Sequence, residues 1–227
     1  MENILIVESE NDKYFIEAII KHLNLKNISV EDWTICISGY ECMGGIGNLK
    51  STLNIIRNKI IKDEINKVGI IIDLDSCTIE YRLNQISKDV NSVFKPQPEL
   101  SLNSTHQFIT LDADKDNKFE LACYFINLRG KGELDHILKE IANKESLHAN
   151  CLESFKVCLQ NKDVNFKEKD LLKEWVRFYI RYDTCNGRER NQAERKCDFK
   201  AASQKEIWNF EHECLQELKD FLILFNV

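Results

Sequence analysis

Residues 68–75 read Val-Gly-Ile-Ile-Ile-Asp-Leu-Asp, and this run sets the architecture expected for the chain. A short, nearly continuous apolar run closed by polar residues is typical of a strand buried on both faces of a parallel sheet. Residues 4–7, Ile-Leu-Ile-Val, have the same character, and Glu8 follows them directly. Two such strands in the first half of the chain favour an α/β fold.

Helix-like segments alternate with these strands. Apolar residues at helical spacing predict a helix over residues 11–25, started by Asn11 or Asp12 as its N-cap. Further elements are expected in the following order: a strand at 33–37, a helix opened by the glycines at 44–47, a helix at 78–90, and a hairpin of strands at 107–111 and 120–128. Because strand–helix–strand units make right-handed crossovers, the sequence predicts a mostly parallel sheet flanked by helices.

The second half of the chain has a different pattern. Apolar residues recur at helical spacing around residues 134–141, 147–158, 171–179 and 207–221, and no strand signal competes with them. We therefore expect an α/β domain at residues 1–140 and a C-terminal helical lobe at residues 141–227.

The composition narrows the class of protein. The chain has 227 residues, 31 basic and 37 acidic, with a net charge of −6, which excludes a strongly basic nucleic-acid binder but not a local basic patch. No apolar run approaches the roughly 20 residues of a membrane span, and the short run at 4–7 does not resemble a signal peptide. The nine cysteines contain no C-x-x-C pair, so reduced thiols in the cytoplasm are expected.

Zinc binding by the cysteines is not favoured. Cys185, Cys197, His212 and Cys214 can be drawn as a four-ligand set, but their spacings match no common zinc finger or ribbon. Cysteines acting as small buried hydrophobic residues are the expected alternative.

Carboxylates follow the predicted strands at their carboxyl ends. Glu8 comes after the first strand, and Asp73 and Asp75 close the isoleucine-rich strand, where residues i and i+2 point to one side. Ligands bind at this edge of α/β sheets, and carboxylates that converge there repel one another unless a cation neutralises them. Oxygen ligands predict Mg²⁺ or Mn²⁺. The alternative is that these acids only cap helices or form turns.

This combination of motifs resembles the Toprim domain of topoisomerases, bacterial primases and OLD-family nucleases. The segment from Val7 to Phe15 is similar to the first family motif, with Glu8 as its glutamate and Asp12 as its downstream acid. Residues 71–75 match the D-x-D motif. Residues 132–135, Gly-Glu-Leu-Asp, resemble an element of small stand-alone bacterial Toprim-like proteins, and the resemblance covers about residues 3–140. Ser9 departs from the glycine that usually follows the glutamate.

The resemblance implies a Toprim-like domain that cleaves DNA or RNA with Mg²⁺ or Mn²⁺. Asp73 and Asp75 would hold the metal, and Glu8 would assist proton transfer or share a second metal. Asp135 or Glu133 would complete a two-metal arrangement, and Asp12 belongs to the same motif set. No P-loop is present, so an ABC-type ATPase would be a separate partner, in anti-phage defence or nucleic-acid repair. The resemblance also makes a homodimer a reasonable expectation.

Two other functions remain open from the sequence. One is a non-catalytic Toprim-fold module that binds an ATPase or a nucleic acid without cutting, and the other is a receiver-like signalling domain phosphorylated on Asp73. A basic segment offers candidate nucleic-acid contacts at Arg188, Arg190, Arg195 and Lys196. Because acidic residues are interleaved with them, a solvated, salt-bridged helix is the alternative for this segment.

Overall fold

The computed structural model describes residues 3–32, 49–63, 65–130, 132–165 and 167–226. It divides into two compact units. The sheet unit comprises Met1–Gly132 together with Gln216–Val227, and the helical unit comprises Glu133–Leu215. This division differs from the expected boundary at residue 140, and the last residues of the chain return to the sheet unit.

The sheet unit is built on five strands in the order β2-β1-β3-β5-β4. The strands are β1 (Asn3–Val7), β2 (Ile28–Asp32), β3 (Lys67–Asp73), β4 (Ile109–Asp112) and β5 (Lys118–Ile126). Neighbouring strands are parallel except β4, which forms an antiparallel hairpin with β5. The predicted α/β class, the mostly parallel sheet and the hairpin are therefore confirmed.

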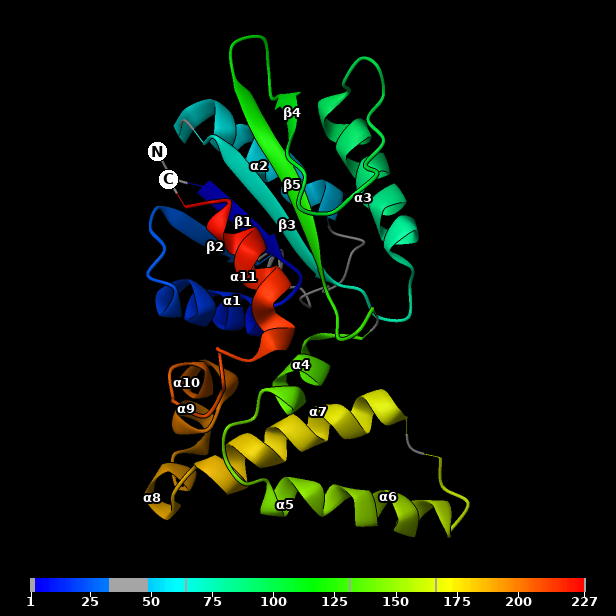
Figure 1. Ribbon diagram of the computed structural model, residues 1–227, viewed down its shortest axis with the longest axis vertical. Helices are drawn as coiled ribbons and strands as arrows, with labels where there is room; N and C mark the ends of the chain where they lie inside the picture. Colours follow the sequence, from blue (N-terminus) through cyan, green and yellow to red (C-terminus); the bar gives the residue numbers. More distant parts are fainter. Residues whose placement is uncertain (1–2, 33–48, 64, 131, 166, 227) are drawn as a thin grey trace, which may run out of the picture. The chain divides into compact units, whose positions relative to one another are not determined.

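Helices cover both faces of this sheet (Figure 1). They are α1 (Glu10–His22), α2 (Leu49–Asp63), α3 (Ile79–Phe94) and α11 (Gln216–Ile223). The crossovers from β1 to β2 and from β2 to β3 run in opposite directions, so right-handed connections place α1 and α2 on opposite faces. Buried residues of α2 and α3 form one apolar cluster with alternate residues of the strands. On the other face, Phe221 of α11 contacts Tyr124 of β5, with ring centroids 5.5 Å apart.

The helical unit consists of short helices. They are α4 (Leu134–Glu140), α5 (Leu147–Asn150), α6 (Leu152–Gln160), α7 (Glu168–Phe178), a π-helical turn (Tyr179–Thr184), α8 (Gly187–Arg190), α9 (Ala193–Lys196), α10 (Phe199–Ser203) and a 3₁₀ turn (Glu213–Leu215). The fully buried Tyr179 organises the core, since its ring stacks on Trp175 and its hydroxyl donates to the carbonyl of Ile207 at 2.7 Å.

Several local expectations change. Ser9, rather than Asn11 or Asp12, is the N-cap of α1. The expected strand at 33–37 and the glycines at 44–47 lie outside the described residues. The single helix expected over residues 207–221 is wrong, because the α-helix begins only at Gln216, after the 3₁₀ turn at Glu213–Leu215. The backbone at Ile207 instead accepts hydrogen bonds from Tyr179 and Asn143, which replace the bonds of a helix.

The cysteines also differ from expectation. Cys185 and Cys197 form a disulfide that closes the segment carrying α8 and α9. A disulfide across this pair removes two members of the four-ligand zinc set considered from the sequence.

None of the helices in the described part of the chain is both long and apolar enough to cross a bilayer.

Gly69 of β3 leaves room for the side chains of Leu5 and of Phe225, which follows α11. A Cβ atom at this position would lie 2.5 Å from Cδ2 of Leu5 and 2.8 Å from Cζ of Phe225, both side chains being fully buried. We expect Gly69→Ala to lower the free energy of unfolding by about 1–3 kcal/mol, since neither neighbour can move without disturbing the core. Chemical denaturation would measure this. Gly187→Ala is the matched control, because a Cβ atom at Gly187 meets nothing within 4 Å; an equal loss in both variants would contradict this packing.

Candidate metal site

The site lies where the direction of the chain through the sheet reverses. The chain leaves β1 toward β2 on one side and then returns to β3 on the other side of β1. In open α/β sheets, the crevice outside the carboxyl ends of the strands at such a switch point is where ligands bind. Val7 at the end of β1 is level with Ile71, two residues before Asp73 at the end of β3. The fold therefore places Glu8, Asp73 and Asp75 at this edge.

Backbone hydrogen bonds fix the chain directly after β3. The amide of Asp75 donates to the carbonyl of Gly132 at 2.7 Å, and the amide of Gly132 donates back to Asp75 at 2.9 Å. Asp75 has a φ of +55° and Gly132 a φ of +102°. A glycine adopts this second conformation without strain, and an aspartate tolerates the first better than most residues. This bridge brings Glu133, the residue after Gly132, beside the D-x-D motif.

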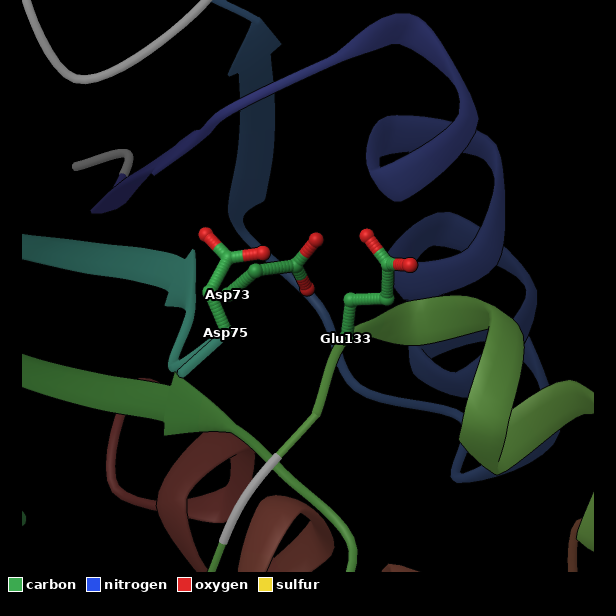
Figure 2. Close-up of side chains that lie close together, drawn as sticks. All are labelled: Asp73, Asp75 and Glu133. Carbon is green, nitrogen blue, oxygen red and sulfur yellow. The ribbon is translucent and has the colours of Figure 1, made fainter. Parts of the chain in front are cut away.

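Three carboxylates gather at this point, as Figure 2 shows. One oxygen from each of Asp73, Asp75 and Glu133 lies within 4.8 Å of the others. Asp73 and Asp75 are partly exposed, whereas Glu133 is only 4% exposed. Among the described residues, this is the one group of three or more acids, histidines or cysteines with metal-like spacing.

Two basic side chains already contact these acids. Nη2 of Arg82, in the first turns of α3, lies 2.7 Å from Oδ2 of Asp75. Nζ of Lys169, at the start of α7, lies 2.6 Å from Oε2 of Glu133. These contacts neutralise part of the negative charge that would otherwise oppose bringing the three carboxylates together.

Glu133 carries the strongest indication of a ligand. Its second oxygen, Oε1, is buried and has no hydrogen-bond partner among the described residues. A buried carboxylate oxygen without a partner costs free energy, and a cation placed there would remove this cost. Three carboxylates and no nitrogen or sulfur donor form a set that suits a hard divalent ion such as Mg²⁺ or Mn²⁺.

Asp135 lies two residues further on, in the first turn of α4, and is outside the group of three. Burial and then the Glu133 carboxylate raise the pKa of Asp135, while Lys173, His136 and Lys169 oppose this shift. The pKa of Asp135 is therefore raised mainly because its carboxyl group is buried, and the neighbouring Glu133 carboxylate adds to this effect.

Two other predicted acids, Glu8 and Asp12, are not members of the group of three. Glu8 follows β1 directly and is half-buried, but its carboxylate is not one of the three. Asp12 is buried in the first turn of α1, where its Oδ2 accepts a 2.6 Å hydrogen bond from the hydroxyl of Ser9. Ser9 in turn accepts a hydrogen bond from the Asp12 amide at 3.3 Å, so in this structure Asp12 serves the helix cap.

The predicted nucleic-acid contacts lie in the helical unit. Arg188 and Arg190 are on α8, Arg195 and Lys196 are on α9, and all four are exposed. The acidic residue Glu189 is held by Lys205, whose Nζ lies 2.8 Å from its Oε1, and this contact lowers the pKa of Glu189. The segment is therefore two short helices closed by the Cys185–Cys197 disulfide, and not the single salt-bridged helix considered as its alternative.

Arg82 and Lys169 were not predicted as site residues. Arg82 had a local signal, because it stands seven residues after Asp75 and faces back toward the end of β3 from the first turns of the next helix. Lys169 had none, since its partner Glu133 is remote in the sequence and the contact depends on how α7 packs on α4.

The fold and the site together define a doubly wound α/β protein with a cluster of carboxylates at its switch point. The sequence model of the family described as "Protein of unknown function (DUF3226)" matches residues 2–225, and the chain belongs to this family. No curated protein and no solved structure gives a significant match.

Proposed function

We propose that the sheet unit is a Toprim-like domain and that the protein is a nuclease that hydrolyses phosphodiesters of DNA or RNA with Mg²⁺ or Mn²⁺. The observation that carries this proposal is the convergence of Asp73, Asp75 and Glu133 at the switch point of the sheet. Carboxylates at this position can hold a divalent cation that binds a phosphate group at the same time.

Each acid has an assigned role in this proposal. Asp73, Asp75 and Glu133 would hold the cation, which would supply Lewis-acid chemistry to a phosphoryl oxygen and to water when bound. Glu8, at the end of the neighbouring strand, accepts the proton from the attacking water. This role is supported by the half-buried position of Glu8 directly after β1, the strand that neighbours β3.

The partners follow from the same proposal. Four exposed basic residues on α8 and α9 provide contacts to a nucleic-acid backbone: Arg188, Arg190, Arg195 and Lys196. An ABC-type ATPase acts as a separate subunit, and a homodimer would supply two sites for cutting both strands of a duplex. Anti-phage defence or nucleic-acid repair in the cytoplasm is the setting that this combination suggests.

The purified chain tests the proposal directly. It is incubated with single-stranded DNA, duplex DNA and RNA in Mg²⁺, in Mn²⁺ and in EDTA, with and without an ABC-type ATPase and ATP. We expect cleavage that requires the metal, stops in EDTA and returns when the metal is added back. Cleavage that persists in EDTA, or its absence under every condition, would refute the nuclease. Metal binding without cleavage would instead support the non-catalytic module.

A further inference from the structure

Arg82 is an unusual residue for its position. Its side chain is only 8% exposed, although it lies on α3 and contacts the partly exposed Asp75. An arginine is seldom buried to this degree unless its donors are matched by acceptors. Nη2 contacts Asp75 and Nη1 donates to Oε1 of Gln85 at 3.2 Å, whereas Nε is buried with no hydrogen-bond partner among the described residues.

The vacant donor belongs to the edge of the guanidinium that recognises oxyanions. Nε and Nη2 lie on one edge of the group and donate in parallel, which matches two oxygens of a carboxylate or a phosphate. In this structure Oδ2 of Asp75 occupies Nη2 and no acceptor occupies Nε, so the edge is half used. A second oxyanion oxygen at this edge would satisfy the buried Nε.

The net charge of the three carboxylates and their basic partners limits the number of divalent cations that can bind. Asp75 and Glu133 each have a basic partner, Arg82 and Lys169, so only part of the charge of the three carboxylates is left to attract metal ions. One divalent cation exceeds the remaining negative charge of this group and leaves a surplus that attracts a phosphate. A second divalent cation would have to displace a base that is already in contact.

We propose that the site binds one divalent cation and that the guanidinium of Arg82 takes the place of a second, contacting a phosphate oxygen of the substrate beside the metal. This inference rests on the proposed metal site and deepens it, because it names the group that recognises the phosphate. Arg82 competes with the metal for Asp75, and it binds the substrate anion through the Nε edge.

This double role predicts that one substitution changes the affinity for the metal and the affinity for the phosphate in opposite directions. In Arg82→Met, the volume of the side chain is largely kept while its charge and donors are lost. We expect the Mn²⁺ affinity to rise by about tenfold or a second Mn²⁺ to bind, because a competing cation is gone. We expect the affinity for deoxythymidine monophosphate in the presence of Mn²⁺ to fall by about tenfold. An arginine that merely held the site in shape would weaken both affinities when removed.

The measurements use the full chain. Titration calorimetry and the electron paramagnetic resonance signal of free Mn²⁺ give the stoichiometry, and titration with deoxythymidine monophosphate gives the anion affinity. Arg82→Lys keeps the charge and remains informative if Arg82→Met fails to fold; it should bind one Mn²⁺. Arg57→Met is the matched control, since Arg57 is a partly buried arginine of the same unit that donates to the carbonyls of Ala113 and Val93. Its affinities should equal those of the wild type.

The outcomes separate this inference from the function on which it rests. One Mn²⁺ per wild-type chain, with tighter metal and weaker phosphate binding in Arg82→Met, supports it. Two Mn²⁺ ions in the wild type, or weaker metal binding in Arg82→Met, overturns the inference and leaves the metal site standing. Failure of the wild type to bind any Mn²⁺ overturns the metal site and the inference together.

Discussion

Asp73→Asn is expected to reduce Mg²⁺-dependent cleavage by about a thousandfold or more, since a lost carboxylate ligand removes several kcal/mol of metal binding and charge stabilisation. The substitution keeps the size of the side chain. Asp73 is the last residue of β3 and pairs with Ile126 through its backbone, which the variant retains. The loss should therefore appear in the initial rate of cleavage at saturating nucleic acid and not in the stability of the fold.

A second aspartate at the end of a strand provides the control for this experiment. Asp112 closes β4, is 67% exposed in its side chain and lies 3.7 Å from Lys118, away from the group of three acids. Asp112→Asn should cleave at the wild-type rate. If Asp73→Asn retains cleavage within tenfold of the wild type, the three carboxylates are not the catalytic metal site, whatever other residues supply the activity.

The part of the fold that could be predicted is the part encoded by local pattern. The strands at residues 4–7 and 68–74 were evident because a strand buried on both faces consists of consecutive apolar residues, and both are fully buried in the structure apart from Asp73 itself. The same local logic located Asp73 at the end of a strand. Asp75 lies beyond β3 with a φ of +55°, so its position is set by the backbone bridge to Gly132 and not by the two-residue period of a strand.

The remaining features depend on contacts between segments that are remote in the sequence. Residues 207–212 have apolar spacing compatible with a helix. However, Trp208 forms a β-bridge with Ala142, and the carbonyl of Ile207 accepts a hydrogen bond from the Tyr179 hydroxyl. These tertiary hydrogen bonds override the helical tendency. Glu133 stood in a recognisable motif, yet its approach to Asp75 follows from the backbone bridge at Gly132. No periodicity along the chain reports such a pairing.

The return of α11 to the sheet is the clearest of these remote contacts, and it predicts a large loss of stability in Phe221→Ala. Phe221 is fully buried, and its ring lies 5.5 Å from that of Tyr124 and 5.1 Å from that of Phe225. Its replacement would leave a cavity between α11 and β5 and lower the free energy of unfolding by about 3–5 kcal/mol. Urea denaturation followed by circular dichroism would measure the change.

Ile223 on the same helix separates loss of this contact from a general weakening of the helix. It is 49% exposed, so Ile223→Ala should change the free energy of unfolding by about 0.5 kcal/mol or less. Hydrogen exchange then identifies which unit is affected: in Phe221→Ala the amides of β1, β3 and β5 should exchange faster, because α11 belongs to the sheet unit. The opposite result would be unchanged hydrogen-exchange protection of the strands together with faster exchange in the helical unit. In that case α11 stabilises the helical unit, and the boundary expected at residue 140 describes the chain better than the division in the structure.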